Sequence, residues 1–502
     1  MKVVITYPPL NTAKGIPLLS QNRQFQYFKR PTYIYPVVPA TAATLLKKEG
    51  FKVVWKDCIA EGWDLERFYA FIQEEKPDVI AIETKTPVVK EHWEIIDRVS
   101  AVGGSASGGK GQRLSPKVVL LGDHVTALPE ESFENSKVDF VITGGDYDFL
   151  LFNLCSYLRD LQAIGQLTTK LEPGIYYREN GQVKNTGKFQ LNHNLDVLPF
   201  IDRDLTNWKL YAYENGNYKN TPGTYIMSAR DCWWGRCTFC SWPALYPQYR
   251  SRTPGNVLEE VSLLVEKYGV QEIMDDSGSL SAGQWLKDFS NGMISRGLNK
   301  RVNFDCNMRF GALSAEDYRL MKRAGFRLLL FGLESANQNT LDRINKNLTV
   351  QQIIDSCKLA RKSGLYPHIT VMFGYPWETY EEAVKTLKLG QWLLKKGYAY
   401  TMQATVVIPY PGSPLFEECK ANEWLKTTDW QRYDMKEPVM KSPINDEKIM
   451  SLVQSLYRVA LHPEFIFNRL TSISSLGDFA FFFRAFPRVF GHIFDFKAGA
   501  KK

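Results

Sequence analysis

Residues 231–242 read Asp-Cys-Trp-Trp-Gly-Arg-Cys-Thr-Phe-Cys-Ser-Trp, and this stretch holds three of the chain's eight cysteines, Cys232, Cys237 and Cys240. Thiolates are ligands of Zn²⁺ and of iron–sulfur clusters. A structural zinc site would complete its ligands with a second Cys-x-x-Cys or a histidine pair, and none of the six histidines lies near the stretch. Three thiolates therefore favour a [4Fe–4S] cluster with one iron left open for another ligand. The alternative is three small buried side chains on a turn.

The composition is that of a globular protein too long for one ordinary domain. The chain has 502 residues, of which 44% are apolar and 23% charged, and two or three domains are expected. Its net charge of +8 is spread out and does not indicate nucleic-acid binding. No apolar run approaches the ~20 residues of a membrane-spanning helix. The first ten residues indicate a strand rather than a signal peptide, so we expect a cytoplasmic protein with thiols free to bind metal.

Strand and helix patterns alternate through residues 1–155. Short β-branched runs predict strands, and the stretches between them predict helices. This alternation is typical of a doubly wound parallel sheet. The expected strands cover residues 2–6, 51–56, 78–83, 117–121 and 138–143, and the expected helices cover residues 37–48, 65–75 and 89–101.

Ligands of such sheets bind at the carboxyl ends of the strands. Here those ends carry polar residues and glycines, and glycine lets a backbone approach a ligand closely. None of these loops is a Gly-x-Gly-x-x-Gly or a P-loop sequence, so neither a dinucleotide nor a nucleoside triphosphate is indicated. The candidate ligand-binding residues are Pro8, Thr84, Lys85, Thr86, Asp123, His124, Gly144 and Gly145.

Residues 156–215 are interpreted as a connector with a β-hairpin at Asn180-Gly181. The alternation resumes over residues 216–420, where about six βα units predict a partial (β/α)6 barrel of the TIM type. Capping boxes are expected at Ser314, Thr349 and Thr379. The expected strands cover residues 270–275, 301–308, 327–333, 367–373 and 399–408, and the expected helices cover residues 254–267, 282–296, 314–324, 337–345, 350–363 and 379–396.

Polar residues and glycines follow the expected barrel strands. Each one by itself could be a turn or a helix cap, but their recurrence at the same end of successive strands favours a site. They are Asp275, Asp276, Asn307, Arg309, Glu334, Ser335, Gly374 and residues 409–412.

Residues 421–502 change character and predict a mostly helical, Phe-rich extension. From Phe465 onward, phenylalanines alternate with basic residues such as Arg469, Arg484 and Arg488. A basic amphipathic segment can lie on a membrane surface or line a channel for a hydrophobic substrate. The alternative is a helix that packs on the barrel.

Together these residues resemble the radical S-adenosylmethionine (SAM) superfamily, and within it the cobalamin-binding subgroup, over nearly the whole chain. The resemblance rests on the three cysteines and on five further stretches. These are Asp275-Asp276, Gly-Leu-Glu-Ser at 332–335, Gly-Tyr-Pro-Trp-Glu-Thr at 374–379, Pro-Tyr-Pro-Gly-Ser-Pro at 409–414, and Asp123–Glu131, which is similar to a Pro-His-Ala-Thr-Ala-Leu-Pro-Glu-Glu stretch of the subgroup.

The resemblance implies an N-terminal flavodoxin-like domain that binds cobalamin through the eight residues named above. It further implies a partial barrel that holds a [4Fe–4S] cluster on Cys232, Cys237 and Cys240, and SAM beside it. The implied SAM contacts are Asp275 or Asp276 with Arg309 for the methionine moiety, Glu334 for the ribose, and Gly374, Ile408 and Tyr410 for the adenine.

Three departures from the family pattern are visible. The usual spacing is Cys-x-x-x-Cys-x-x-Cys, whereas four residues separate Cys232 from Cys237. Gly235 permits a tighter path, so we keep all three cysteines as ligands. A Gly-Gly-Glu motif is replaced by Asp275-Asp276 at the equivalent strand end. The Asp-x-His-x-x-Gly motif of cobalamin-ligating domains is absent, so cobalamin is expected to bind without a protein imidazole on cobalt.

The activity implied by the resemblance is reductive cleavage of SAM to a 5′-deoxyadenosyl radical, with an electron donor such as a ferredoxin or flavodoxin. The main expectation is methyl transfer to an unactivated carbon of a hydrophobic small molecule. The alternative within the same architecture is oxidative cyclisation or other C–C bond formation on a tetrapyrrole or a lipid. An alternative from another class is a non-catalytic carrier of an Fe–S cluster or cobalamin. Peripheral membrane contact is a further expectation for the Phe-rich extension.

Overall fold

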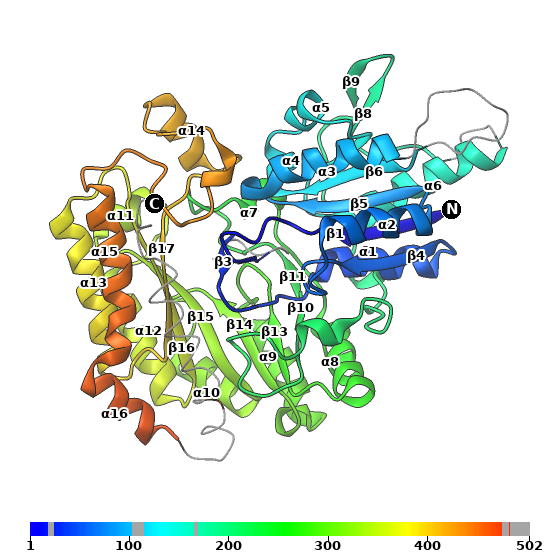
Figure 1. Ribbon diagram of the computed structural model, residues 1–502. Helices are drawn as coiled ribbons and strands as arrows, with labels where there is room; N and C mark the ends of the chain where they lie inside the picture. Colours follow the sequence, from blue (N-terminus) through cyan, green and yellow to red (C-terminus); the bar gives the residue numbers. More distant parts are fainter. Residues whose placement is uncertain (19–24, 103–114, 165–168, 474–480, 482–502) are drawn as a thin grey trace.

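The computed structural model describes residues 1–18, 25–102, 115–164, 169–473 and 481. Two mainly parallel sheets organise this part of the chain, one in the N-terminal third and one in the barrel segment, and helices pack on both (Figure 1). The predicted α/β fold class is therefore confirmed. Most of the Phe-rich stretch after residue 473 lies outside the described residues.

The N-terminal sheet has the strand order β4-β1-β5-β6-β7-β8-β9. Its first five strands are parallel, in the 2-1-3-4-5 order of flavodoxin-like sheets. Every residue of β5 is buried, as expected of a parallel strand covered on both faces. The elements are β1 (Lys2–Tyr7), α1 (Val37–Lys48), β4 (Lys52–Asp57), α2 (Leu65–Glu75), β5 (Val79–Thr84), η1 (Thr86–Val88), α3 (Val89–Val102), β6 (Lys117–Gly122), α4 (Asp123–Ala127), α5 (Glu131–Asn135), β7 (Phe140–Ile142) and α6 (Tyr147–Ile164), with the small hairpin β2 (Ile16–Pro17) and β3 (Tyr27–Phe28).

The hairpin at Asn180-Gly181 forms, but it extends the N-terminal sheet instead of standing in a separate connector. β8 (Ile175–Glu179) pairs antiparallel with β7, and β9 (Gln182–Asn185) completes the sheet. The proposed domain boundary at residue 155 falls inside α6. The Asn-Gly turn is encoded by neighbouring residues, so the hairpin itself is predictable. Tertiary contacts decide which other strand the hairpin pairs with. Two short 3₁₀ helices follow, η2 (Leu195–Val197) and η3 (Trp208–Tyr211).

Six parallel strands in the order β10-β13-β14-β15-β16-β17 form the second sheet, an open half-barrel with helices on its outer side (Figure 1). The short hairpin β11–β12 stands apart from it. The elements are β10 (Gly223–Ile226), β11 (Ala229–Arg230), α7 (Trp242–Leu245), β12 (Arg250–Ser251), α8 (Pro254–Tyr268), β13 (Glu272–Asp275), α9 (Gln284–Ser295), η4 (Leu298–Lys300), β14 (Asn303–Met308), α10 (Ala315–Arg323), β15 (Phe326–Glu334), α11 (Gln338–Arg343), α12 (Val350–Lys362), β16 (Tyr366–Phe373), α13 (Tyr380–Lys395) and β17 (Thr401–Val406).

The predicted capping boxes fix the starts of three barrel helices. At Ser314, Thr349 and Thr379 the N-cap side chain accepts a hydrogen bond from the backbone N–H three residues later. The side chain of that later residue accepts a hydrogen bond from the N-cap backbone N–H in return. Each box satisfies two helix amides that would otherwise lack partners, and loss of such a cap costs about 1 kcal/mol. These helix starts are thus encoded locally.

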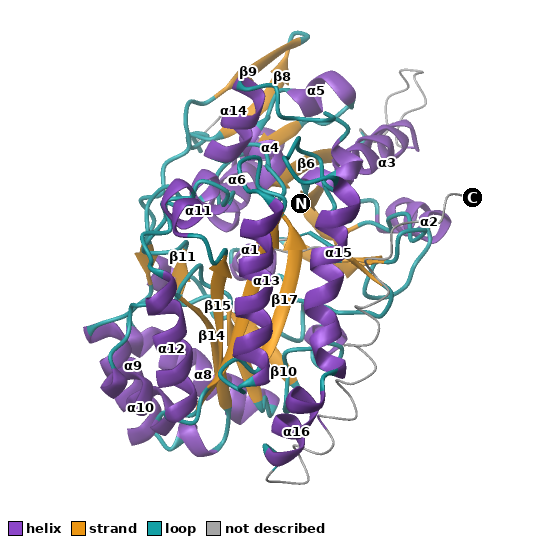
Figure 2. Cartoon of the chain, turned by 90° about the vertical axis from the view of Figure 1, so that its left-hand side faces the viewer, coloured by secondary structure: helices purple, strands orange, loops and turns teal. Residues whose placement is uncertain are grey.

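The C-terminal segment closes one side of the half-barrel. It comprises α14 (Pro414–Ala421), η5 (Trp430–Arg432), α15 (Asp446–Tyr457), η6 (Arg458–Leu461) and α16 (Pro463–Thr471). Figure 2 shows α13 and α15 side by side in front of β17, and the Tyr457 hydroxyl bonds to both backbone groups of Ala404 in that strand, at 3.0 and 3.1 Å. Among the described residues no helix combines the length and apolar character needed to cross a membrane.

A buried ionic cluster joins the N-terminal sheet to the cysteine loop. Arg230, two residues before Cys232, lies 3.1 Å from Asp146 and 2.5 Å from Asp148. Arg250 reaches the same Asp146 carboxylate at 2.6 Å. Because both aspartates are fully buried, their pairing with two arginines fixes the position of the cysteine loop against the N-terminal domain.

His193 completes this cluster. Its Nδ1 lies 3.3 Å from Asp146 and its Nε2 lies 3.0 Å from Glu172. Burial opposes the charge of the imidazole, but the hydrogen bonds to these two carboxylates raise the pKa of His193 to about 9.

The raised pKa of His193 predicts a loss of stability at alkaline pH. A group whose pKa is higher in the folded state stabilises fully below its unfolded pKa of about 6.5, and that stabilisation disappears as pH rises through about 9. The thermal unfolding midpoint should therefore fall between pH 6.5 and 9 more steeply in the natural protein than in His193→Gln. Parallel profiles for the two proteins would contradict the assignment.

Candidate active site

A cavity of about 200 Å³ lies at the carboxyl ends of the half-barrel strands, where the sequence predicts the site. All three clustered cysteines line it. Four of the seven predicted SAM contacts line it as well, namely Arg309, Glu334, Ile408 and Tyr410. The cysteine loop and the ends of β14, β15 and β17 thus meet around one space.

The additional residue in the cysteine loop is accommodated by a left-handed turn. Gly235 has φ +54°, and a Cβ there would lie 3.2 Å from the carbonyl oxygen of Cys232. The two tryptophans before it are anchored outside the loop, because Trp233 Nε1 donates to Leu280 O at 3.2 Å and Trp234 Nε1 donates to Asn345 O at 2.9 Å. The loop therefore keeps all three cysteines on the cavity wall despite the unusual spacing.

The three cysteines form no disulfide and are half-buried. The described residues hold no tight group of three or more His, Cys, Asp or Glu suited to a single metal ion. The fit to a multi-iron cluster therefore rests on the shared cavity and on the soft donor set. The other five cysteines are buried, and none of them lines the cavity.

Gly278 brings the end of β13 against the cysteine loop. Cys232 forms an isolated parallel bridge with Ser279, and a Cβ on Gly278 would lie 2.7 Å from the Cβ of Cys232. Both Gly278 and Ser279 line the cavity. We had not singled them out from the sequence, although small residues directly after the Asp-Asp pair were a usable signal.

Asp275 supports the cavity from below instead of lining it. This aspartate is fully buried, and its carboxylate accepts from the backbone and hydroxyl groups of Ser228 and Ser277, including 3.0 Å from Ser277 N and 2.6 Å from Ser277 Oγ. Both carboxylate oxygens are engaged within the protein, so the contact of Asp275 with SAM stays a prediction that this geometry does not support. Asp275 instead fastens the chain after β10, which leads into the cysteine loop, to the turn after β13.

Two further predicted contacts also lie off the cavity wall. Asp276 is half-buried, and its backbone nitrogen bonds to Ile226 O at 2.9 Å. Gly374 directly follows β16 and faces α15, where a Cβ would lie 3.3 Å from Ile449. Neither residue borders the cavity. A contact between either residue and SAM stays a prediction that this geometry does not support.

A buried ion pair lies next to the cysteine loop and lines the same cavity. Glu334, at the end of β15, has φ +61° and accepts from Lys346 Nζ at 2.8 Å. Arg309 donates to the carbonyl oxygens of Lys346 and Asn347 and stacks 4.1 Å from the Trp234 ring. No feature of the sequence had marked Lys346, because a lone lysine after a helix has no motif.

Burial and the neighbouring charges set the electrostatics of this wall. Burial opposes the charge of Lys346, but Glu334 raises the pKa of its ammonium group, which stays protonated at neutral pH. Burial also raises the pKa of the Cys237 thiol, and Lys346 opposes that rise. Two cations, Lys346 and Arg309, therefore face the cysteine loop together with a single carboxylate, so the wall favours an anionic group.

The residues predicted to contact cobalamin lie at the carboxyl edge of the N-terminal sheet, but none borders the barrel cavity. Most are buried and paired with one another. Lys85 Nζ lies 3.3 Å from Asp123 Oδ2. His124 Nδ1 lies 3.3 Å from Thr86 Oγ1, and its Nε2 lies 3.0 Å from Glu131. Both nitrogens of this histidine are engaged within the protein, and binding of cobalamin without a protein imidazole on cobalt stays a prediction.

The two glycines at this edge meet side chains instead of open space. A Cβ on Gly144 would overlap the Phe189 ring, and one on Gly145 would overlap the Tyr246 ring. Gly145 N also donates to Leu245 O in α7 at 3.0 Å. A contact between these glycines and a ligand therefore stays a prediction that this packing does not support. They instead let α7, which directly follows the cysteine loop, pack against the N-terminal sheet.

Comparison with known proteins agrees with this site. Residues 227–390 match the profile of the Radical SAM superfamily. Over 430 residues the chain is 30% identical to an uncharacterized methyltransferase of Pyrococcus horikoshii, covering 84% of this chain and 86% of that protein. It is 27% identical over 414 residues to the anaerobic magnesium-protoporphyrin IX monomethyl ester cyclase of Cereibacter sphaeroides, covering 80% of this chain and 63% of that enzyme.

Two solved structures share the fold across both sheets. The radical SAM methyltransferase TsrM from Kitasatospora setae, with cobalamin and a [4Fe–4S] cluster bound, has a TM-score of 0.67 at 15% identity and covers 97% of this chain and 99% of its own. The cobalamin-dependent SAM radical enzyme OxsB, with aqua-cobalamin and SAM bound, has a TM-score of 0.67 at 14% identity and covers 98% of this chain and 71% of its own. With the profile match and the Pyrococcus relative, the cavity at Cys232, Cys237 and Cys240 identifies this chain as a member of the radical SAM superfamily of enzymes.

Proposed function

We propose that this protein is a cobalamin-dependent radical SAM methyltransferase that methylates an unactivated carbon of a hydrophobic small molecule. One observation carries the proposal: three thiols from one loop share a cavity with the buried Glu334–Lys346 pair at the carboxyl ends of six parallel strands. Relatives named as methyltransferases support the reaction type. The non-catalytic carrier is disfavoured, because a carrier needs no cationic groups in the cavity that its cluster would share.

The cysteines are proposed to bind the cluster, and Arg309 and Glu334 in the same cavity are proposed to bind SAM. Cys232, Cys237 and Cys240 would hold the [4Fe–4S] cluster, which when bound supplies the electron for reductive cleavage of SAM at its open iron. Arg309 presents its guanidinium to the carboxylate of the methionine moiety. Glu334 gives one oxygen to Lys346 and can accept a ribose hydroxyl with the other.

Cobalamin is proposed at the carboxyl edge of the N-terminal sheet, where it would supply the methyl group. That edge packs on α7, so it lies against the cysteine loop. The fully engaged His124 offers no ligand to cobalt. Lys85 is paired with Asp123 and Thr86 with His124, so both side chains must exchange partners if they contact cobalamin. The reductant is proposed to be a ferredoxin or flavodoxin.

The apolar part of the cavity wall is consistent with a hydrophobic substrate. Leu330, Phe331, Met372, Val407 and Met435 line the cavity beside the polar groups described above. Apolar side chains of this kind position a ligand through contact area and exclude water from a reactive species.

The test is a product assay on anaerobically purified protein with SAM, a reductant and a panel of tetrapyrrole, isoprenoid and fatty-acyl compounds. Methylation adds 14 mass units to the substrate, as required when a methyl group replaces hydrogen. The visible spectrum of the same preparation should show both the cluster and cobalamin. Loss of hydrogen without added carbon would overturn methyl transfer. That outcome would instead favour the cyclase alternative, which the Cereibacter sphaeroides relative supports.

Lys346→Met should weaken both the fold and the binding of SAM. The substitution keeps most of the side-chain volume but leaves the Glu334 carboxylate buried without its cation, which costs about 3 kcal/mol of folding free energy. An unpaired Glu334 is driven to protonate and accepts a ribose hydroxyl less well, so the Kd for SAM should rise about tenfold. Equilibrium dialysis and chemical unfolding measure the two effects. Lys362→Met, at an exposed position, is the control. An unchanged Kd for SAM in Lys346→Met would contradict the proposed role of Lys346.

A further inference from the structure

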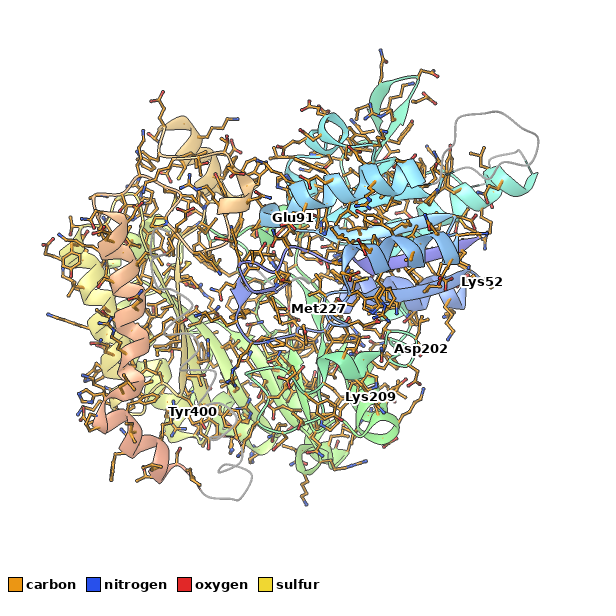
Figure 3. All side chains as sticks on the ribbon, in the orientation of Figure 1. Lys52, Glu91, Asp202, Lys209, Met227 and Tyr400 are labelled. Atoms are coloured by element: carbon orange, nitrogen blue, oxygen red, sulfur yellow. The ribbon has the colours of Figure 1, made fainter. Side chains whose placement is uncertain are left out.

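A second cavity, of about 190 Å³, lies at the opposite end of the half-barrel from the cysteines. Ala399 and Tyr400, directly before β17, form its floor, and α16 forms one wall. Figure 3 shows Tyr400 low in the half-barrel, well away from Met227 at the end that carries the cysteine loop. This space is therefore separate from the candidate active site and has no part in the proposed chemistry.

Two guanidinium groups, those of Arg361 and Arg469, line this cavity. Arg469 of α16 lies 3.7 Å over the Tyr400 ring and 4.8 Å from the Phe465 ring. Arg361 donates to two backbone oxygens, Gly397 O at 2.8 Å and Leu365 O at 3.2 Å. Within the described part of the chain, neither arginine forms an ion pair with a carboxylate. A third cation on the wall, Lys396, is already paired with Glu464 at 2.9 Å.

The neighbouring guanidinium groups of Arg361 and Arg469 form a positive site that an anion from outside the protein can occupy. Burial and the neighbouring Arg361 lower the pKa of Arg469 to about 10, so its guanidinium is still charged at neutral pH. Guanidinium groups match the geometry of phosphate oxygens and bind them through pairs of hydrogen bonds. The cavity therefore has the chemistry of a phosphate site.

The same helix carries an exposed apolar face. No residue of α16 is buried. Ile466, Phe467 and Leu470 recur at helical spacing on one side, and Phe467 is 65% exposed. Leu461, just before the helix, is exposed as well. Large apolar side chains clustered on a short helix next to basic residues are typical of an element that lies in a membrane interface.

We propose that α16 docks the enzyme on an anionic lipid surface, with Phe467 and Leu470 at the headgroup–acyl boundary and a lipid phosphate between Arg361 and Arg469. The charge of the cavity complements phosphate, and the apolar face complements the lipid beneath it. This inference goes beyond the proposed function and does not depend on it, because neither the cluster nor SAM is involved.

The test is flotation of the full-length protein with vesicles of phosphatidylcholine alone and of phosphatidylcholine with phosphatidylglycerol. Partition into the anionic vesicles should exceed partition into the neutral ones. Phe467→Ser should reduce partition into the anionic vesicles about tenfold, which corresponds to the free energy of burying one aromatic side chain. Arg469→Gln and Arg361→Gln should each reduce partition into the anionic vesicles about fivefold and flatten its salt dependence. The matched controls are Val197→Ser, at a residue that is 62% exposed on the connector, and Arg67→Gln on α2.

Four results would overturn the proposal. Equal partition into neutral and anionic vesicles would show that anionic lipid is not the partner. No effect of Phe467→Ser would show that the apolar face of α16 does not contact the lipid. Saturation of the protein by inorganic phosphate, with no vesicle binding, would leave a site for free anions only. A dimer in gel filtration that becomes a monomer in Phe467→Ser would make this face an interface between two copies. Thermal unfolding of each variant checks that the fold is retained.

Discussion

Replacing Cys237 with alanine should abolish the bound cluster and the reductive cleavage of SAM together. Cys237 lies between the other two cysteines on one loop, and all three line the same cavity. With two thiolates left, a second iron loses its protein ligand, and the cluster is no longer held. Iron and sulfide content should fall to background. Release of 5′-deoxyadenosine from SAM, measured after dithionite reduction, should fall about a thousandfold or more.

The matched control is Cys357→Ala. Cys357 is buried in α12 and borders no part of the cavity, and alanine is a strong helix former. This variant should keep its cluster and its 5′-deoxyadenosine release. Cys232→Ala and Cys240→Ala should behave like Cys237→Ala. Full cluster content in Cys237→Ala, or equal losses in Cys237→Ala and Cys357→Ala, would show that the cysteine loop is not the cluster site.

Features that depend on neighbouring residues were predictable from the sequence. The capping boxes at Ser314, Thr349 and Thr379 involve partners three residues away, and all three form. The turn at Gly235 likewise depends on one residue's freedom to adopt a positive φ. The strand–helix alternation gave the architecture because parallel strands and their covering helices follow one another along the chain.

Features that depend on distant partners were not predictable in this way. Asp275 was expected on SAM, but Ser228, 47 positions earlier, occupies its carboxylate. Gly145 was expected to border a ligand, but Tyr246, from beyond the cysteine loop, fills that space. Lys346 was overlooked because only the folded chain places it against Glu334. For Asp275 and Gly145 the residue type was compatible with the predicted role, but a residue distant in the sequence occupies the group concerned.

Gly278→Ala should release the cluster although all three ligand cysteines are still present in the chain. An added Cβ would lie 2.7 Å from the Cβ of Cys232 and would overlap its backbone nitrogen, so the loop that begins the ligand set must shift. Both sides of this contact are backbone or short side chains, which cannot rotate away. Overpacking of this kind costs about 1–3 kcal/mol. Reconstituted iron per chain and 5′-deoxyadenosine release should both fall at least about tenfold.

Gly255→Ala separates this effect from a general loss of glycine. Gly255 lies in the first turn of α8, where an added Cβ meets nothing within 4 Å, so alanine is expected to be neutral or slightly stabilising. Circular dichroism should show that Gly278→Ala keeps its helices and strands, because the clash is confined to the loop after β10 and the turn after β13. A folded Gly278→Ala protein with full cluster content would mean that the loop has room to move. In that case the close approach of Gly278 to Cys232 would not be what positions the first thiolate.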